Sequence, residues 1–249
     1  MVPIPKIAPG TEFGPLRIRG ERVFVLTGAG VSAESGVPTF RDAGGLWEQH
    51  RVEDVATPEG FWRDPEMVWR FYSQRRLKAR EVQPNPAHVA LAKLERELGD
   101  RLFLCTQNVD ALHERGGSKN VCHMHGRLMS TKCSRCAREP FDDENAYEAP
   151  PKCPECDALL RPDVVWFGEM PHHLPRIFET LEQTDLFVTI GSSGAVYPAA
   201  GFVSHLRTVG RARCVYIGLE EPENAHSFDE CRLGKAGELV PSLFEVDKR

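Results

Sequence analysis

The sequence contains no apolar run that approaches the ~20 residues needed to span a bilayer, so no membrane-spanning helix is expected. Residues 1–6 have neither the pattern of a secretory signal nor the Arg- and Ser-rich pattern of a transit peptide, so the cytoplasm is the expected location. Basic residues are not in excess, because 31 Lys and Arg against 36 Asp and Glu give a formal net charge of −5. This balance argues against nucleic-acid binding through bulk positive charge.

The cysteine pattern does not indicate a disulfide framework. Of eight cysteines, four form two C-x-x-C pairs, Cys133 with Cys136 and Cys153 with Cys156. Two such pairs supply the four thiolates of a closed tetrahedral zinc site. Because sulfur would fill every position and leave none for water, the spacing predicts one structural Zn²⁺. A zinc ribbon that binds nucleic acid is the functional alternative, which the acidic residues 142–144 disfavour.

The length of 249 residues and the hydrophobic content of 41% suit one large α/β domain, alone or with a small insert. Short apolar runs alternate with helix-like segments along the chain. This alternation predicts a mostly parallel, doubly wound α/β sheet. The predicted strands are residues 23–26, 102–106, 121–125, 186–190 and 214–217, with a further β-prone run at 164–167, and the predicted helices are 65–80, 87–98 and 174–183.

A glycine-rich segment follows the first predicted strand. Gly28-x-Gly30-x-x-Ala33 fits the Gly/Ala form of the dinucleotide-binding fingerprint. Its glycines would allow backbone N–H groups to approach a pyrophosphate, and the next helix would present its N-terminal dipole. A plain glycine turn between strand and helix would give the same pattern about as often. No second strand with a ribose-binding acid follows, which disfavours the alternative of a conventional NAD oxidoreductase.

Polar residues follow the second predicted strand. Gln107, Asn108 and Asp110 come directly after it, and ligands in open α/β sheets bind beyond the carboxyl ends of strands. A capped turn is the structural alternative, since Asn and Asp also favour turns. At the end of the next strand, His125 stands beside a glycine. This open approach favours His125 over His123 as a reactive histidine.

Two further features are candidates for ligand contacts. Gly191, Ser192 and Ser193 follow a predicted strand and suit contacts with phosphate or ribose. Tyr72 and Arg75 are three residues apart on a predicted helix and therefore share a face. Without any further indication, a solvated basic helix end explains Arg75 better than a binding role does.

Together these motifs resemble those of the sirtuins, the NAD-dependent protein lysine deacylases, from about residue 23 to residue 244. The motifs are residues 28–41, 106–113 and 125–126, the two C-x-x-C pairs, and residues 191–193. The chain is most similar to the bacterial-type and mitochondrial members that remove acidic acyl groups. The resemblance implies a Rossmann-like NAD-binding domain at residues 1–125 and 159–249, with a helical insert at about 45–80, and an inserted small zinc-binding domain at 126–158.

The resemblance implies that NAD is consumed. The acyl oxygen would attack C1′ of the nicotinamide ribose and release nicotinamide. His125 would then act as general base on a ribose hydroxyl, so that the acyl group leaves as O-acyl-ADP-ribose. The implied NAD-binding residues are Gly28, Ala29, Gly30, Ser32, Ala33, Glu34, Thr39, Phe40, Arg41, Trp47, Gln107, Asn108, Asp110, Gly191, Ser192, Ser193, Gly218, Leu219, Glu220 and Ala236.

The implied substrates are acetyl-, succinyl- and malonyl-lysine side chains of proteins. Arg75 would bind an acidic acyl carboxylate through two parallel hydrogen bonds, Tyr72 would add a third, and the small Ala56 would leave room. The residues implied at the acyl-lysine channel are Val164, Trp166 and Phe167. One departure is Gly218, because sirtuins of this type commonly carry there an Asn that contacts the adenine ribose.

Overall fold

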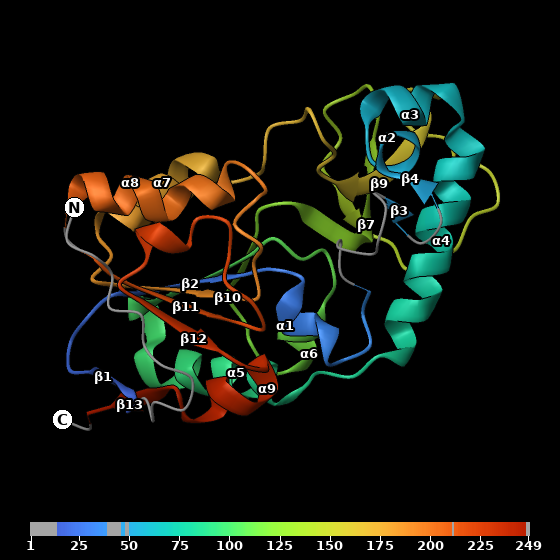
Figure 1. The fold of residues 1–249 in the computed structure, drawn as a ribbon. Helices are drawn as coiled ribbons and strands as arrows, with labels where there is room; N and C mark the ends of the chain where they lie inside the picture. The colour runs from blue at the N-terminus through green and yellow to red at the C-terminus, as the bar shows by residue number, and fades with distance from the viewer. Residues whose placement is uncertain (1–13, 39–45, 48–49, 211, 248–249) are drawn as a thin grey trace.

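The computed structural model describes residues 14–38, 46–47, 50–210 and 212–247. Figure 1 shows two lobes, a larger one in which helices cover a sheet and a smaller one that includes the long helix α4 (Pro65–Glu81). Among the described residues, no helix combines the length and the apolar character needed to cross a membrane.

The larger lobe is built on a six-stranded sheet in the order β12-β11-β10-β2-β5-β6. Every neighbouring pair in it is parallel. The chain places β5 and β6 on one side of β2 and β10, β11 and β12 on the other, which is the doubly wound order with a switch point between β2 and β10. This confirms the predicted fold class. The strands are β2 (Val23–Thr27), β5 (Leu102–Thr106), β6 (Val121–His123), β10 (Leu186–Ile190), β11 (Arg213–Gly218) and β12 (Glu230–Leu233).

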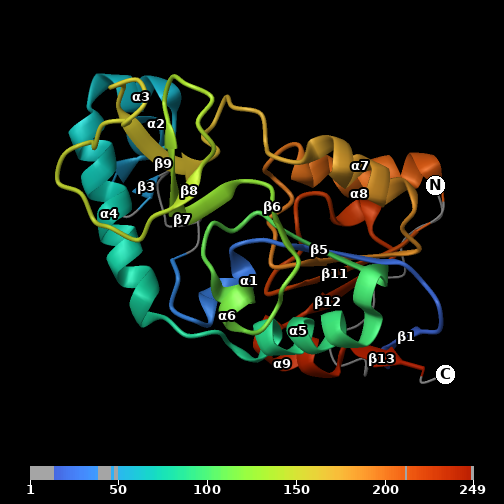
Figure 2. The ribbon, with the colours of Figure 1, turned by 180° about the vertical axis from the view of Figure 1, so that it is seen from behind.

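Helices cover both faces of this sheet, as the two opposite views show (Figures 1 and 2). Alternate residues of a strand point to opposite faces, so Val25 packs in the core under α5 and α9 while Phe24 packs under α7 and α8. Burial on both faces explains why the central strands are continuously apolar. The helices are α5 (Pro86–Leu98) and α9 (Ala236–Leu239) on one side, and α7 (Leu174–Glu182) and α8 (Phe202–Val209) on the other.

Local signals set the ends of the two long helices. The side chain of Asp64 accepts a hydrogen bond from the Met67 amide at 2.9 Å, and Pro65 occupies the first turn of α4. Asn85 caps α5 in the same way. Gly99, with φ +55°, ends α5 in the left-handed region that favours glycine.

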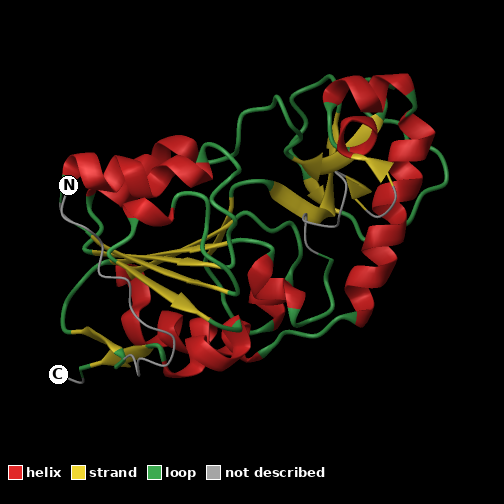
Figure 3. Cartoon of the chain, viewed as in Figure 1, coloured by secondary structure: helices red, strands yellow, loops and turns green. Residues whose placement is uncertain are grey.

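The smaller lobe contains the three-stranded sheet β8-β7-β9, the hairpin β3-β4 and helices α2 to α4, as the colouring by secondary structure shows (Figure 3). Strand β9 pairs with β7, so the chain that follows the second C-x-x-C pair is still in this lobe at residue 164. The elements are β3 (Leu46–Trp47), β4 (His50–Arg51), α2 (Val52–Val55), α3 (Pro58–Arg63), β7 (Gly126–Cys133), β8 (Phe141–Asp142) and β9 (Leu160–Val164). The remaining short strands and α-helices belong to neither of these two sheets. They are the strands β1 (Leu16–Ile18) and β13 (Phe244–Val246) and the helices α1 (Gly30–Ala33) and α6 (Leu112–Arg115).

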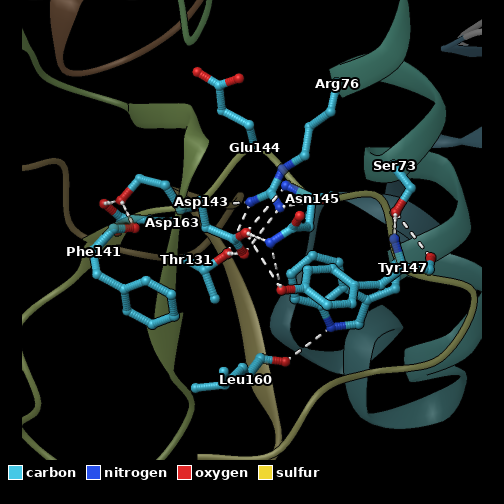
Figure 4. Close-up of polar contacts among 12 residues, drawn as sticks. Ser73, Arg76, Thr131, Phe141, Asp143, Glu144, Asn145, Tyr147, Leu160 and Asp163 are labelled. Carbon is cyan, nitrogen blue, oxygen red and sulfur yellow. Dashed lines mark hydrogen bonds and ion pairs between the residues drawn. The ribbon is translucent and has the colours of Figure 1, made fainter.

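Arg76 attaches α4 to the three-stranded sheet (Figure 4). Its side chain is fully buried and donates to the carbonyls of Leu128 and Ser130, both at 2.9 Å, and to Asp143 at 3.2 Å. Burial lowers the pKa of Arg76, although the Asp143 carboxylate opposes that shift. A buried cation with this many acceptors fixes the rotation of α4 and therefore the direction of Tyr72, one turn away.

Several elements differ from the sequence prediction, among them the following. The β-prone run at residues 164–167 is not a strand, because pairing with β7 places the strand at Leu160–Val164. Strand β12 was not predicted, since two of its residues are charged. The helix after the first glycine loop, α1, has only four residues, so its dipole contributes less than a full helix would.

Candidate active site

A cleft of about 990 Å³ lies between the two lobes. Its lining joins the carboxyl ends of the large sheet to α4 and the segment after β9. All described residues that the sequence assigned to NAD contact line it: Gly28, Ala29, Gly30, Ser32, Ala33, Glu34, Gln107, Asn108, Asp110, Gly191, Ser192, Ser193, Gly218, Leu219, Glu220 and Ala236. His125, the acyl-pocket residues Ala56, Tyr72 and Arg75, and the channel residues Val164, Trp166 and Phe167 line it as well. Thr39, Phe40 and Arg41 lie outside the described residues, as does the side chain of Trp47.

The two glycine loops meet at the switch point of the sheet. The amide of Gly28 donates to the Ile190 carbonyl at 2.9 Å, and the amide of Gly30 donates to the Gly191 carbonyl at 2.8 Å. A Cβ at Gly30 would lie 2.7 Å from Cα of Gly191, and one at Gly191 would lie 2.4 Å from the Val31 nitrogen. Only glycine allows this approach, which leaves the backbone of both loops open to the cleft.

Behind the first loop lies a buried polar network. Asn108 donates to the Gly28 carbonyl at 3.2 Å and to Oγ of Ser32 at 3.1 Å, and Ser32 donates to Asp110 at 3.1 Å. Burial raises the pKa of Asp110. These bonds hold three polar side chains of the cleft in fixed positions, which exceeds what a simple capped turn requires.

Two histidines lie beneath this network. Nε2 of His113 lies 2.9 Å from Oγ1 of Thr27, and the ring of His88 packs edge-on against His113 with ring centroids 4.9 Å apart. Burial lowers the pKa of His88 to about 4 and that of His113 to about 3. Both rings are therefore neutral at pH 7.

His125 is oriented toward the cleft by a backbone contact. Its Nδ1 lies 3.1 Å from the Gln107 carbonyl, which can only accept, so Nδ1 carries the proton. Burial lowers the pKa of His125, and the hydrogen bond to Gln107 opposes that shift. A neutral His125 in this tautomer has its lone pair on Nε2. This is the arrangement that a general base requires.

At the other end of the cleft, α4 contributes Tyr72 and Arg75. Nε1 of Trp166 donates to the Tyr72 hydroxyl at 2.9 Å, and desolvation raises the pKa of that phenol to about 12. The carbonyl of Ala56 accepts from the Phe167 amide at 2.9 Å. These contacts bring the predicted acyl-pocket and channel residues side by side. Arg75 faces this part of the cleft, whereas its neighbour Arg76 is buried in the sheet contact described above.

The four paired cysteines form one cluster away from the cleft lining. Their sulfur atoms all lie within 4.8 Å of one another, and the pairs Cys133–Cys156 and Cys136–Cys153 are each 3.6 Å apart. Four thiolates at about 2.3 Å from a tetrahedral zinc ion would stand about 3.8 Å apart. The donor set and its dimensions therefore fit such an ion.

Sequence reasoning missed several residues of the cleft. Tyr216 lines the cleft although it lies before the last residue of its strand. Glu169, which pairs with Arg161 at 2.6 Å, also lines the cleft. Their positions depend on how β11 and β9 end, which no local motif indicates. Glu114 binds Nε2 of His123 at 2.6 Å behind Asn108, a contact between separate segments that composition alone does not reveal.

These features define the class. The model of the Sir2 family matches residues 28–198, and the chain belongs to that family. Among curated relatives, the NAD-dependent protein deacylase of Vibrio cholerae serotype O1 is 53% identical over 226 residues, which cover 90% of this chain and 92% of that protein. The NAD-dependent protein deacylase of Escherichia coli K12 is 52% identical over 235 residues, 93% of this chain and 84% of that protein.

Solved structures agree with this assignment. The crystal structure of a Sir2 homologue–NAD complex matches with a TM-score of 0.82 and 44% identity, over 90% of this chain and 88% of that one. A structure of Sir2 bound to an acetylated peptide matches with a TM-score of 0.76 and 29% identity, over 89% and 91% of the two chains.

Proposed function

We propose that this protein is an NAD-dependent protein lysine deacylase that removes acetyl, succinyl and malonyl groups and yields nicotinamide and O-acyl-ADP-ribose. The observation that carries the proposal is the position of His125. Its proton-accepting nitrogen lies in a cleft shared by two glycine loops and by the Tyr72–Arg75 face of α4. The names and bound molecules of the Sir2 relatives support the same reaction class.

NAD would supply an anomeric carbon from which nicotinamide can leave. The open backbone at Gly28, Gly30 and Gly191 would bind its pyrophosphate. Asn108 and Asp110 would contact the nicotinamide and its ribose, with Gln107 against the same ribose. Arg41 and Phe40 are proposed to hold the phosphates and to shield the reacting carbon from water.

His125 would move one proton in this reaction. As the ribose hydroxyl attacks the carbon of the transferred acyl group, Nε2 of His125 accepts the hydroxyl proton, and the Gln107 carbonyl stabilises the ring by accepting from Nδ1. The lowered pKa of His125 keeps the ring unprotonated, and thus competent, at neutral pH.

For acidic acyl groups, the carboxylate would bind between the Arg75 guanidinium and the Tyr72 hydroxyl. The Tyr72 oxygen accepts from Trp166, and the phenol O–H is the donor that would bind that carboxylate. The raised pKa of Tyr72 keeps the phenol neutral, so it retains the proton that it would donate. The lysine chain would lie along Val164, Trp166 and Phe167.

Residues 126–158 are proposed to form the small zinc-binding domain, and residues 1–125 and 159–249, with the helical insert at about 45–80, the NAD-binding domain. One Zn²⁺ held by Cys133, Cys136, Cys153 and Cys156 would stabilise the end of β7 and the segment before β9. With four sulfur ligands the ion would have no open position for water. Its role would therefore be structural.

The proposal is tested by mass spectrometry of acetyl-, succinyl- and malonyl-lysine peptides incubated with and without NAD. Loss of the acyl mass only with NAD, together with one nicotinamide per lysine released, is the expected result. Peptides that stay unchanged would contradict the proposal. A rise in absorbance at 340 nm, caused by NADH, would instead indicate an oxidoreductase.

A further inference from the structure

Gly218, the last residue of β11, lines the cleft without a side chain of its own. A Cβ placed on Gly218 would lie 2.2 Å from the hydroxyl oxygen of Tyr216 and 2.7 Å from its Cζ. Real Cβ atoms do not approach other atoms so closely. The end of the Tyr216 phenol therefore occupies the volume that a side chain at position 218 would fill.

The ring of Tyr216 is held in place from the other side. It is buried to 3% exposure and packs against Phe228 with ring centroids 5.6 Å apart and an interplanar angle of 58°. Tyr216 also lines the cleft. A tyrosine with its apolar body in the core and its hydroxyl at a cavity presents a fixed hydrogen-bonding group to a ligand.

The order of the strands places this hydroxyl along the cleft. His125 and Asn108 follow β6 and β5, the glycine loops follow β2 and β10, and Gly218 ends β11. Neighbouring strands are about 4.8 Å apart, so β5 and β11 are separated by roughly 14 Å. A dinucleotide whose nicotinamide half lies at His125 and whose pyrophosphate lies at the glycine loops must place its adenosine half at β11.

We propose that the Tyr216 hydroxyl hydrogen-bonds a ribose hydroxyl of the adenosine half of NAD, and that position 218 is glycine because this phenol needs the space. The inference rests on the proposed NAD-dependent function. It assigns to Tyr216 a polar contact that glycine at position 218, which has no side chain, cannot make. The alternative is that Tyr216 only packs against Phe228.

Titration calorimetry with ADP-ribose and with nicotinamide mononucleotide separates these two roles, since only ADP-ribose carries the adenosine half. Tyr216→Phe retains the ring and its packing but removes the hydroxyl. We expect the Kd for ADP-ribose to rise about five- to ten-fold, the usual effect of one lost hydrogen bond, while the Kd for the mononucleotide stays unchanged. Tyr147→Phe, in the smaller lobe, is the matched control and should alter neither value.

An unchanged Kd for ADP-ribose in Tyr216→Phe, or an equal weakening of both ligands, would overturn the inference while leaving the proposed function intact. A wild-type protein that binds no ADP-ribose would contradict both. A second comparison tests the steric part. Gly218→Asn and Tyr216→Leu should each lower the free energy of unfolding. The double variant should lower it by less than the sum of the two single effects, because the shorter leucine leaves room for the asparagine. Strict additivity would show that the phenol and position 218 do not compete for space.

Discussion

Nε2 of His123 lies 2.6 Å from Oε1 of Glu114, while Nδ1 of the same ring lies 3.2 Å from the Asn108 carbonyl. Both oxygens are acceptors, so each ring nitrogen of His123 faces a hydrogen-bond acceptor. Burial favours the neutral acid form of Glu114, but the hydrogen bond and charge of His123 lower its pKa overall. The His123–Glu114 pair thus fixes the backbone carbonyl of Asn108, and His125 fixes the backbone carbonyl of Gln107.

We predict that Glu114→Gln weakens NAD binding through Asn108. The substitution keeps the size of the side chain but removes its charge, so the KM for NAD should rise about five-fold and the KM for the acyl peptide should change less. Steady-state kinetics with each substrate varied measures both. Glu155→Gln, which removes the charge from an exposed pair with Arg138, is the control and should change neither constant.

Arg75 is predicted to determine the preference for acidic acyl groups. Replacement of Arg75 by Met should lower kcat/KM for a succinyl peptide by about 100-fold, because two charge-assisted hydrogen bonds are lost, and should affect an acetyl peptide little. Arg70→Met, one turn earlier on the exposed side of α4, is the control. Equal losses on both peptides would show that Arg75 does not bind the acyl carboxylate.

Acid is predicted to destabilise the fold through His88 and His113. Their folded-state pKa values, about 4 and about 3, lie below the unfolded value near 6.5, so unfolding takes up a proton at each ring. Their contribution is fully present above pH 6.5 and is lost as the pH falls through about 4 for His88 and about 3 for His113. Around pH 5 the two rings together should change the free energy of unfolding by roughly 2 to 3 kcal/mol per pH unit.

Urea unfolding at a series of pH values measures this slope. His113→Gln should reduce the slope by about half, since one of the two protons is no longer taken up. The same slope in the variant and in the wild type would show that His113 does not stay neutral in the folded protein.

Removal of zinc is predicted to act on stability first. Metal analysis should find one Zn²⁺ per chain, and Cys153→Ala should abolish it and lower the melting temperature. A chelator that removes the ion slowly should reduce turnover only as the smaller lobe unfolds, which circular dichroism follows. Immediate inhibition by a metal-binding compound with the fold unchanged would instead place the metal in the chemistry.

Sequence patterns predicted the large sheet well because its central strands are buried on both faces. Residues 23–26, for example, form a continuous apolar run, which is typical of a strand covered by helices on either side. Strand β12 was missed because composition assigns its charged residues to the surface. In the structure the two charges neutralise each other. Arg232 pairs with Glu230 at 2.6 Å, and the pair is nearly buried.

The candidate site residues were predictable where a short sequence motif specifies them, and not where side chains from separate segments meet. The glycine loops and the cysteine pairs fall into this first group. The burial of Arg76 depends on the packing of elements that are distant in sequence. The contact of Tyr216 with position 218 depends on the rotamer of the tyrosine. Neither leaves a periodicity or spacing that could be recognised in advance.

The most direct test of the central claim compares the wild-type protein with His125→Tyr, with nicotinamide and deacylated peptide quantified in the same reaction. We expect the wild type to form the two products in equal amounts and His125→Tyr to form no deacylated peptide while its circular dichroism spectrum is unchanged. Undiminished deacylation by the folded variant would contradict the role of His125 as the general base.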